Sequence, residues 1–107
     1  MDYIKIKTAA VSAVTEVYLY DETIAKVVVG HPEIPAELPS IQDAVKQAIV
    51  NPTRTKQDRP RTVVYIDDAT TNAGGDPLVV PCRIVGGTSA RVASFYFASS
   101  ENTEVKK

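Results

Sequence analysis

Residues 78–85 read LVVPCRIV, a mostly apolar run that contains one proline and one arginine. The length of the run and its content of β-branched residues predict a buried strand. Pro81 has no backbone N–H to donate, so it predicts a bulge or an edge position within this strand.

Two further strands are predicted on either side of this run. TVVYI at 62–66 precedes it, and the turn-rich loop DDATTNAGGDP at 67–77 lies between them. ARVASFYFA at 90–98 follows the run after a hairpin turn at Gly86-Gly87-Thr88. Because sequential strands joined by short turns pair antiparallel, we predict a three-stranded meander.

The N-terminal half predicts a hairpin followed by a helix. EVYLY at 16–20 and TIAKVVV at 23–29 are rich in aromatic and β-branched residues, and a tight turn at 21–22 would join them as strands. Apolar residues at helical spacing predict a helix over 41–50, which Ser40 would cap and Asn51-Pro52 would end.

The predicted fold class is therefore α+β. A small antiparallel sheet, made of the hairpin and the meander, would carry one main helix packed on one face. We expect a single domain over residues 1–99 and a flexible C-terminal tail over 100–107.

Composition limits the classes of function. A chain of 107 residues with 44% hydrophobic content suits one folded domain. The formal net charge of −1 gives no overall attraction to nucleic acids or anionic membranes, so any phosphate site must be a local patch. No apolar run approaches about 18 residues, and we expect a cytoplasmic chain with no membrane partner. The single cysteine, Cys82, cannot form a disulfide within the chain.

GHPEI at 30–34 contains the only histidine of the chain. An unperturbed histidine titrates near neutral pH, so His31 is a candidate general acid or base. Pro32 restricts its backbone to an extended conformation. The alternative is that this segment merely leads into the following helix.

A basic segment, TRTKQDRPR at 53–61, supplies candidate phosphate ligands. The candidates are Arg54, Lys56, Arg59 and Arg61. Arginine suits bidentate contacts with phosphate oxygens. The alternative is a solvated loop that flanks a strand.

The last predicted strand offers hydroxyl groups. Ser94 and Tyr96 share one face, while Phe95 and Phe97 share the opposite face and are expected in the core. Both hydroxyls can donate hydrogen bonds, although a half-exposed sheet face would look the same. The loop carboxylates at 67, 68 and 76 fit no metal-ligand spacing, so we expect neither a metal nor another cofactor.

The order of these features resembles the barnase/EndoU/colicin/RelE-like nuclease superfamily, and within it the small nuclease-like domains of phages and mobile elements. The resemblance rests on HPEI at 31–34, on AVKQAIVNP at 44–52, and on a final strand with Ser94-Phe95-Tyr96 in place of a Thr-Ala-Tyr-like triplet. It spans about residues 16–99. The chain departs from the pattern at Gly30, where a basic residue is frequent.

The resemblance implies metal-independent RNA cleavage, in which the ribose 2′-hydroxyl attacks the adjacent phosphate. It implies His31 as acid or base and Glu33 as a possible second acid–base group. Arg54 and Lys56 would stabilise the phosphate, and Ser94 and Tyr96 would donate hydrogen bonds. Glu33 has no such role if it caps the connector or pairs with a basic residue.

Two hypotheses follow from these residues. The chain is either a small toxin-like endoribonuclease, with RNA and an immunity or antitoxin protein as possible partners, or an inactive binding or assembly module on the same scaffold. The first predicts that His31, the basic segment and Ser94 and Tyr96 converge on one site, whereas the second predicts that they do not.

Overall fold

The computed structural model describes residues 2–98, apart from the side chains of residues 58 and 59. The predicted tail at 100–107 lies outside the described residues. In chain order the elements are β1 (Tyr3–Val11), β2 (Val14–Tyr20), α1 (Asp21–Gly30), α2 (Ile34–Glu37), α3 (Ile41–Val50), β3 (Arg54–Arg59), β4 (Thr62–Thr71), β5 (Pro77–Gly86), β6 (Ser89–Val92) and β7 (Tyr96–Phe97).

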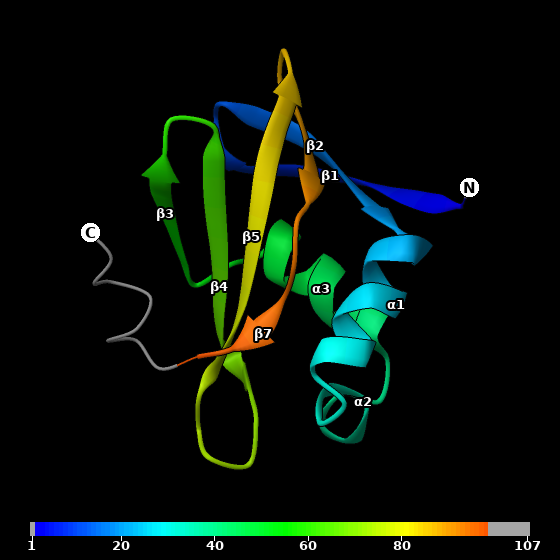
Figure 1. The fold of residues 1–107 in the computed structure, drawn as a ribbon. Coiled ribbons are helices and arrows are strands. Elements are labelled where there is room, and N and C mark those ends of the chain that lie inside the picture. The colour runs from blue at the N-terminus through cyan, green and yellow to red at the C-terminus, as the bar shows by residue number, and fades with distance from the viewer. Residues whose placement is uncertain (1, 99–107) are drawn as a thin grey trace.

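One curled, mixed sheet dominates the molecule (Figure 1). Its strand order is β1-β2-β6-β5-β4-β3, and β7 pairs with β5 beyond the end of β6. β2 and β6 run parallel, whereas the other pairs are antiparallel. The predicted small antiparallel sheet with one main helix is therefore wrong: the structure is a half-barrel with three short helices.

The main error concerns residues 23–29, which form most of α1 instead of a strand. Their β-branched side chains favour strands locally. In the structure, however, Thr23 and Val27 lie one helical turn apart and are both buried. Asp21 and Glu22, interpreted above as a turn, occupy the first helical turn, where carboxylates complement the helix dipole. Tertiary burial thus outweighs strand propensity here.

The helix predicted over 41–50 is confirmed as α3. The Asp43 N–H donates to the Ser40 side chain at 3.3 Å, as expected of an N-cap. Val45, Ala48 and Ile49 are buried against the inner face of the sheet. The Thr8 hydroxyl on β1 donates to the Ile49 carbonyl at 2.8 Å, which ties the edge strand to the end of this helix.

The basic segment is a strand and not a loop. β3 pairs antiparallel with β4, so Arg54 lies opposite Ile66 and Lys56 opposite Val64. The region 67–77 is also shorter as a loop than predicted, because β4 continues to Thr71.

Pro81 lies opposite a break between β6 and β7, whereas the sequence predicted a bulge or an edge position within the strand of Pro81 itself. The Ala93 N–H donates to the Pro81 carbonyl at 2.9 Å, so this side of Pro81 faces the chain between β6 and β7. Cys82 is paired with Val92, and Val79 is paired with Tyr96. The two residues on β5 are three positions apart in the chain, whereas their partners are four positions apart. The extra residue is a bulge, and it reverses the faces of the side chains that follow.

The bulge decides where the last strand places its side chains. Val92 and Phe95 are both buried in the inner core, although simple alternation would place them on opposite faces. Tyr96 and Ala98 instead pack on the other face of the sheet against Val64, Ile66 and Val79. We call this the outer face, because the inner face carries the core cluster that includes α3.

The hydroxyl of Tyr65 is a buried polar group within the inner core. The Tyr65 side chain is fully buried, and its hydroxyl has no hydrogen-bond partner among the described residues. Burial raises the pKa of this hydroxyl well above its usual range. A buried hydroxyl without a partner costs roughly 1–3 kcal/mol, so Tyr65→Phe should raise the free energy of unfolding by about 1 kcal/mol. Urea denaturation would measure the change.

Tyr65→Leu is the matched control, because it removes the ring as well as the hydroxyl. It should lower stability through the cavity that it leaves. A loss of stability in Tyr65→Phe would show that the hydroxyl is hydrogen-bonded in solution.

Candidate functional site

His31 lies directly after α1, where Pro32 ends the helix. The residue before a proline avoids helical angles, and His31 has φ −136° and ψ 71°. Its backbone N–H donates to the Val27 carbonyl at 2.7 Å. The backbone of His31 is therefore anchored to the last turn of α1, while 45% of its side chain remains exposed.

The structure brings His31 next to Tyr96 of β7. The two ring centroids are 6.5 Å apart, with an angle of 28° between the ring planes. This geometry lies within the range of offset-stacked rings. Tyr96 can meet His31 only because the bulge opposite Pro81 turns Tyr96 toward the outer face.

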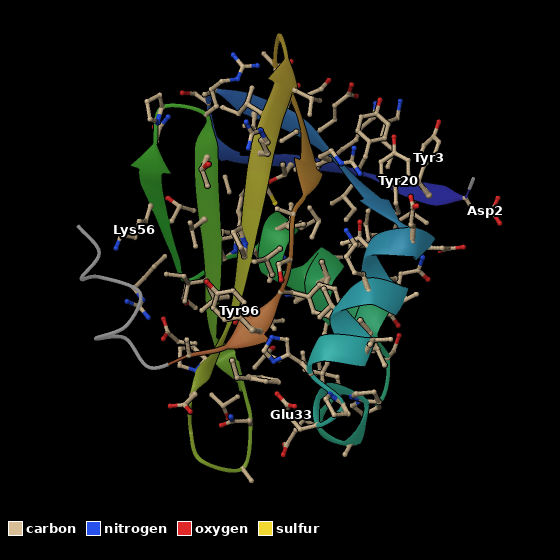
Figure 2. The ribbon with its side chains drawn as sticks, in the orientation of Figure 1. Asp2, Tyr3, Tyr20, Glu33, Lys56 and Tyr96 are labelled. Atoms are coloured by element: carbon tan, nitrogen blue, oxygen red, sulfur yellow. The ribbon has the colours of Figure 1, made fainter. Side chains whose placement is uncertain are left out.

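Glu33 contacts the same histidine. His31 Nδ1 lies 3.3 Å from Glu33 Oε2, and both side chains are partly exposed. When Glu33 accepts a hydrogen bond from Nδ1–H, Nε2 keeps its lone pair and can accept a proton. Figure 2 shows Glu33 in the segment after α1, near the end of the sheet that carries Tyr96.

A cross-strand row connects Tyr96 to the basic strand. Tyr96 is opposite Val79, Val79 is opposite Ile66, and Ile66 is opposite Arg54. Residues paired in this way point to the same face of a sheet. Lys56 lies one side-chain step further along β3 on the same face, and Figure 2 shows it at the outer edge of the sheet.

Arg54 is held by a carboxylate that the sequence did not identify as part of a site. Its Nε and Nη2 atoms donate to the two carboxylate oxygens of Asp68 at 2.8 and 2.9 Å. The Thr53 hydroxyl donates to Asp68 as well, at 2.6 Å. These hydrogen bonds from Arg54 and Thr53 lower the pKa of Asp68. Such pairing fixes the direction of the guanidinium group.

Arg61 lies apart from this row. Arg61 donates from Nη2 to the Ile84 carbonyl at 3.1 Å. It lies five residues before Ile66, roughly 16 Å along the strand direction from the row. The side chain of Arg59 lies outside the described part of the structure. Ser94 is partly exposed in the link between β6 and β7.

The carboxylate of Asp67 serves local structure. Asp67 is buried and accepts from the Ala69 N–H at 3.0 Å and from the Thr70 hydroxyl at 2.9 Å. Within residues 2–98 no cluster of His, Cys, Asp or Glu side chains could hold a metal ion. No helix in this range is long and apolar enough to cross a bilayer.

A shallow groove of about 350 Å³ lies on the other side of Arg54. It is formed by the end of α3, the start of β3 and the irregular part of β1, and its lining residues are Ala10 and residues 50–55. The groove shares Arg54 with the row but does not include His31 or Tyr96.

Sequence reasoning missed Asp68 because it missed β3. Arg54, Thr55, Lys56 and Gln57 are all polar, so the segment lacks the apolar–polar alternation that predicts a strand. When β3 pairs with β4, Arg54 lies opposite Ile66, two residues before Asp68.

Comparison of the chain with protein-family models, with curated proteins and with solved structures gives no significant match.

The Arg54–Asp68 pair predicts a pH dependence of stability. Because the pKa of Asp68 is lowered in the folded state, the pair stabilises the fold above the ordinary pKa of the carboxyl. That contribution is lost as pH falls through the lowered pKa. Asp68→Asn should therefore be less stable than wild type near neutral pH, and the difference should shrink in acid. Urea denaturation at a series of pH values would measure it.

Arg54→Gln is the control background. In that background the pH-dependent effect of Asp68→Asn should largely disappear, because Arg54 is the main cause of the lowered pKa. An unchanged effect would assign the pH dependence to another group.

Proposed function

We propose that this chain is a small endoribonuclease that uses the ribose 2′-hydroxyl as the nucleophile and requires no metal. The observation that carries the proposal is the contact of His31 with Tyr96 at the end of a row that leads to Arg54. A potential proton acceptor, a hydroxyl donor and a cation thus come from three distant segments to the same end of the sheet.

These groups match the needs of the reaction. His31 Nε2 takes the proton of the 2′-hydroxyl, whose oxygen then bonds to the phosphorus. The bond from phosphorus to the 5′ oxygen breaks, and that oxygen is protonated by an acid, a role that we assign to the Tyr96 hydroxyl because its ring stacks on His31. Arg54 lies three strand spacings from Tyr96, about 14 Å, so Arg54 and Lys56 bind a neighbouring phosphate of the RNA instead of the reacting one. The products are a 2′,3′-cyclic phosphate and a 5′-hydroxyl.

Glu33 acts in this proposal through His31. As acceptor from Nδ1–H it selects the tautomer that leaves Nε2 free, and it stabilises the imidazolium after proton transfer. Membership of the barnase/EndoU/colicin/RelE-like superfamily is part of the same proposal. Its support is the HPE segment, the helix α3 that follows it and a final strand whose Tyr96 contacts the histidine. The strand expected directly before HPE is instead the helix α1, which weakens this support.

One observation favours the alternative of an inactive binding module. Arg54 is engaged by both carboxylate oxygens of Asp68. A phosphate would have to share or displace this carboxylate, which weakens the cation as a phosphate ligand. The two functions differ in whether RNA is cut.

Cleavage of RNA in excess EDTA tests the proposal. We expect wild type to produce fragments that end in a 2′,3′-cyclic phosphate. His31→Ala should reduce the rate roughly 10²- to 10⁴-fold, which is typical for the loss of a general acid or base. Tyr96→Phe keeps the ring contact with His31 and removes only the hydroxyl, so it isolates the role of the donor.

Lys46→Gln is the matched control, because Lys46 is an exposed cation on α3 and lies outside the row. It should cut RNA as wild type does. No cleavage at high protein concentration would reject the nuclease and leave the binding module. Equal cleavage by His31→Ala and wild type would remove His31 from the mechanism.

A further inference from the structure

The fold separates the charges of a chain that is almost neutral overall. By strand register, six of the described lysines and arginines lie on the outer face: Lys5, Lys7, Arg54, Lys56, Arg83 and Arg91. Two of the described carboxylates, Glu16 and Asp68, lie on the same face. Among the described side chains, this face therefore has a surplus of four positive charges. The other described charged side chains comprise three basic and eight acidic groups, a surplus of five negative charges. The net charge of the chain gives no sign of this separation, because the two surpluses nearly cancel.

Two arginines of this face oppose each other directly. Arg91 on β6 is the cross-strand partner of Arg83 on β5, and both are exposed. Like charges at such positions destabilise a sheet. No carboxylate of the described residues lies within ion-pair distance of either guanidinium. An anion placed between them would remove the repulsion.

Three tyrosines continue the same face beyond the arginines. The Tyr3 ring lies 5.3 Å from the Tyr18 ring and 5.2 Å from the Tyr20 ring, measured between centroids. The Arg91 guanidinium lies 4.8 Å above the Tyr20 ring, and Tyr18 is the cross-strand partner of Arg91. Tyr3 is 51% exposed. Figure 2 shows Tyr3 and Tyr20 together where β1 begins and β2 ends.

We propose that Arg83, Arg91 and the three tyrosines form a binding surface for single-stranded RNA. A backbone phosphate lies between the two arginines, and an unpaired base stacks on Tyr3. An exposed aromatic ring, here Tyr3, beside cations that lack a carboxylate partner among the described residues is the combination that recognises single strands. An acidic peptide would satisfy the arginines and leave the rings unused, and a duplex would hide its base faces.

The surface is continuous with the candidate site. Arg83 lies four residues along β5 from Val79, the partner of Tyr96, which corresponds to roughly 13 Å. Asp21 and Glu22 at the start of α1 follow Tyr20 and repel a polyanion from the helix side. A strand bound at the arginines is thus directed along the sheet toward His31. This inference rests on the proposed function and extends it by naming its substrate as single-stranded RNA.

Binding of a fluorescent 2′-O-methyl RNA of roughly 12 nucleotides, followed by anisotropy, tests the surface. The methyl group blocks the 2′-hydroxyl, so the full chain can be used and failure to cleave cannot be mistaken for failure to bind. Tyr3→Ala should weaken affinity roughly 5- to 150-fold, the range for loss of one stacked base. Tyr3→Phe keeps the ring and should bind as wild type does.

Arg83→Gln separates binding from folding. It removes one phosphate contact, so the slope of log affinity against log salt should fall by about 0.7. Because it also relieves the repulsion with Arg91, its melting temperature should equal or exceed that of wild type. Lys46→Gln removes the same charge from α3 and should leave the slope unchanged.

Several outcomes would overturn the inference. The first is the absence of probe binding, and the second is an equal loss of affinity in Arg83→Gln and Lys46→Gln. The third is competition by poly-glutamate as strong as that by RNA, which would assign the surface to an acidic protein. A double-stranded probe that binds more tightly than the single strand would reject single-strand recognition. Binding without any cleavage would keep this surface and reject only the nuclease.

Discussion

The missing N–H of Pro81 is the constraint on which the position of Tyr96 on the outer face depends. A central strand normally donates and accepts on both sides, but Pro81 can only accept from Ala93 on the side of β6 and β7. The partner strand therefore carries one extra residue at this position. The resulting change of phase buries Phe95 and exposes Tyr96 to the outer face, where Tyr96 meets His31. A proline in β5 thus positions a side chain of the candidate site.

A second proline, Pro32, positions His31, the other residue of this contact. Pro32 ends α1, and the backbone hydrogen bond to Val27 holds His31 against the last helical turn. The histidine is consequently presented by a rigid helix end, while Tyr96 is presented by a short strand that pairs with the central one. Two anchored backbones can hold a ring contact at low entropic cost, which suits a site that must be formed before the ligand binds.

Local signals predicted the elements that local interactions determine. The cap at Ser40 and the end of α3 before Pro52 each depend on one backbone group and were both visible in the sequence. Residues 23–29 were mispredicted because β-branched side chains favour strands, while burial of Thr23 and Val27 on one face selects the helix. The pairing of Arg54 with Asp68 was missed because it depends on β3, which gains its stability mainly from β4.

By itself, the sequence determined that His31 follows a break before a proline, that basic residues cluster at 54–61 and that the chain is nearly neutral. Only the tertiary structure decided which of these side chains meet. One extra residue in a strand moves every later side chain to the other face, and parallel pairing of β2 with β6 brings Tyr18 beside Arg91. Such register depends on partners far apart in the chain, so no local pattern encodes it.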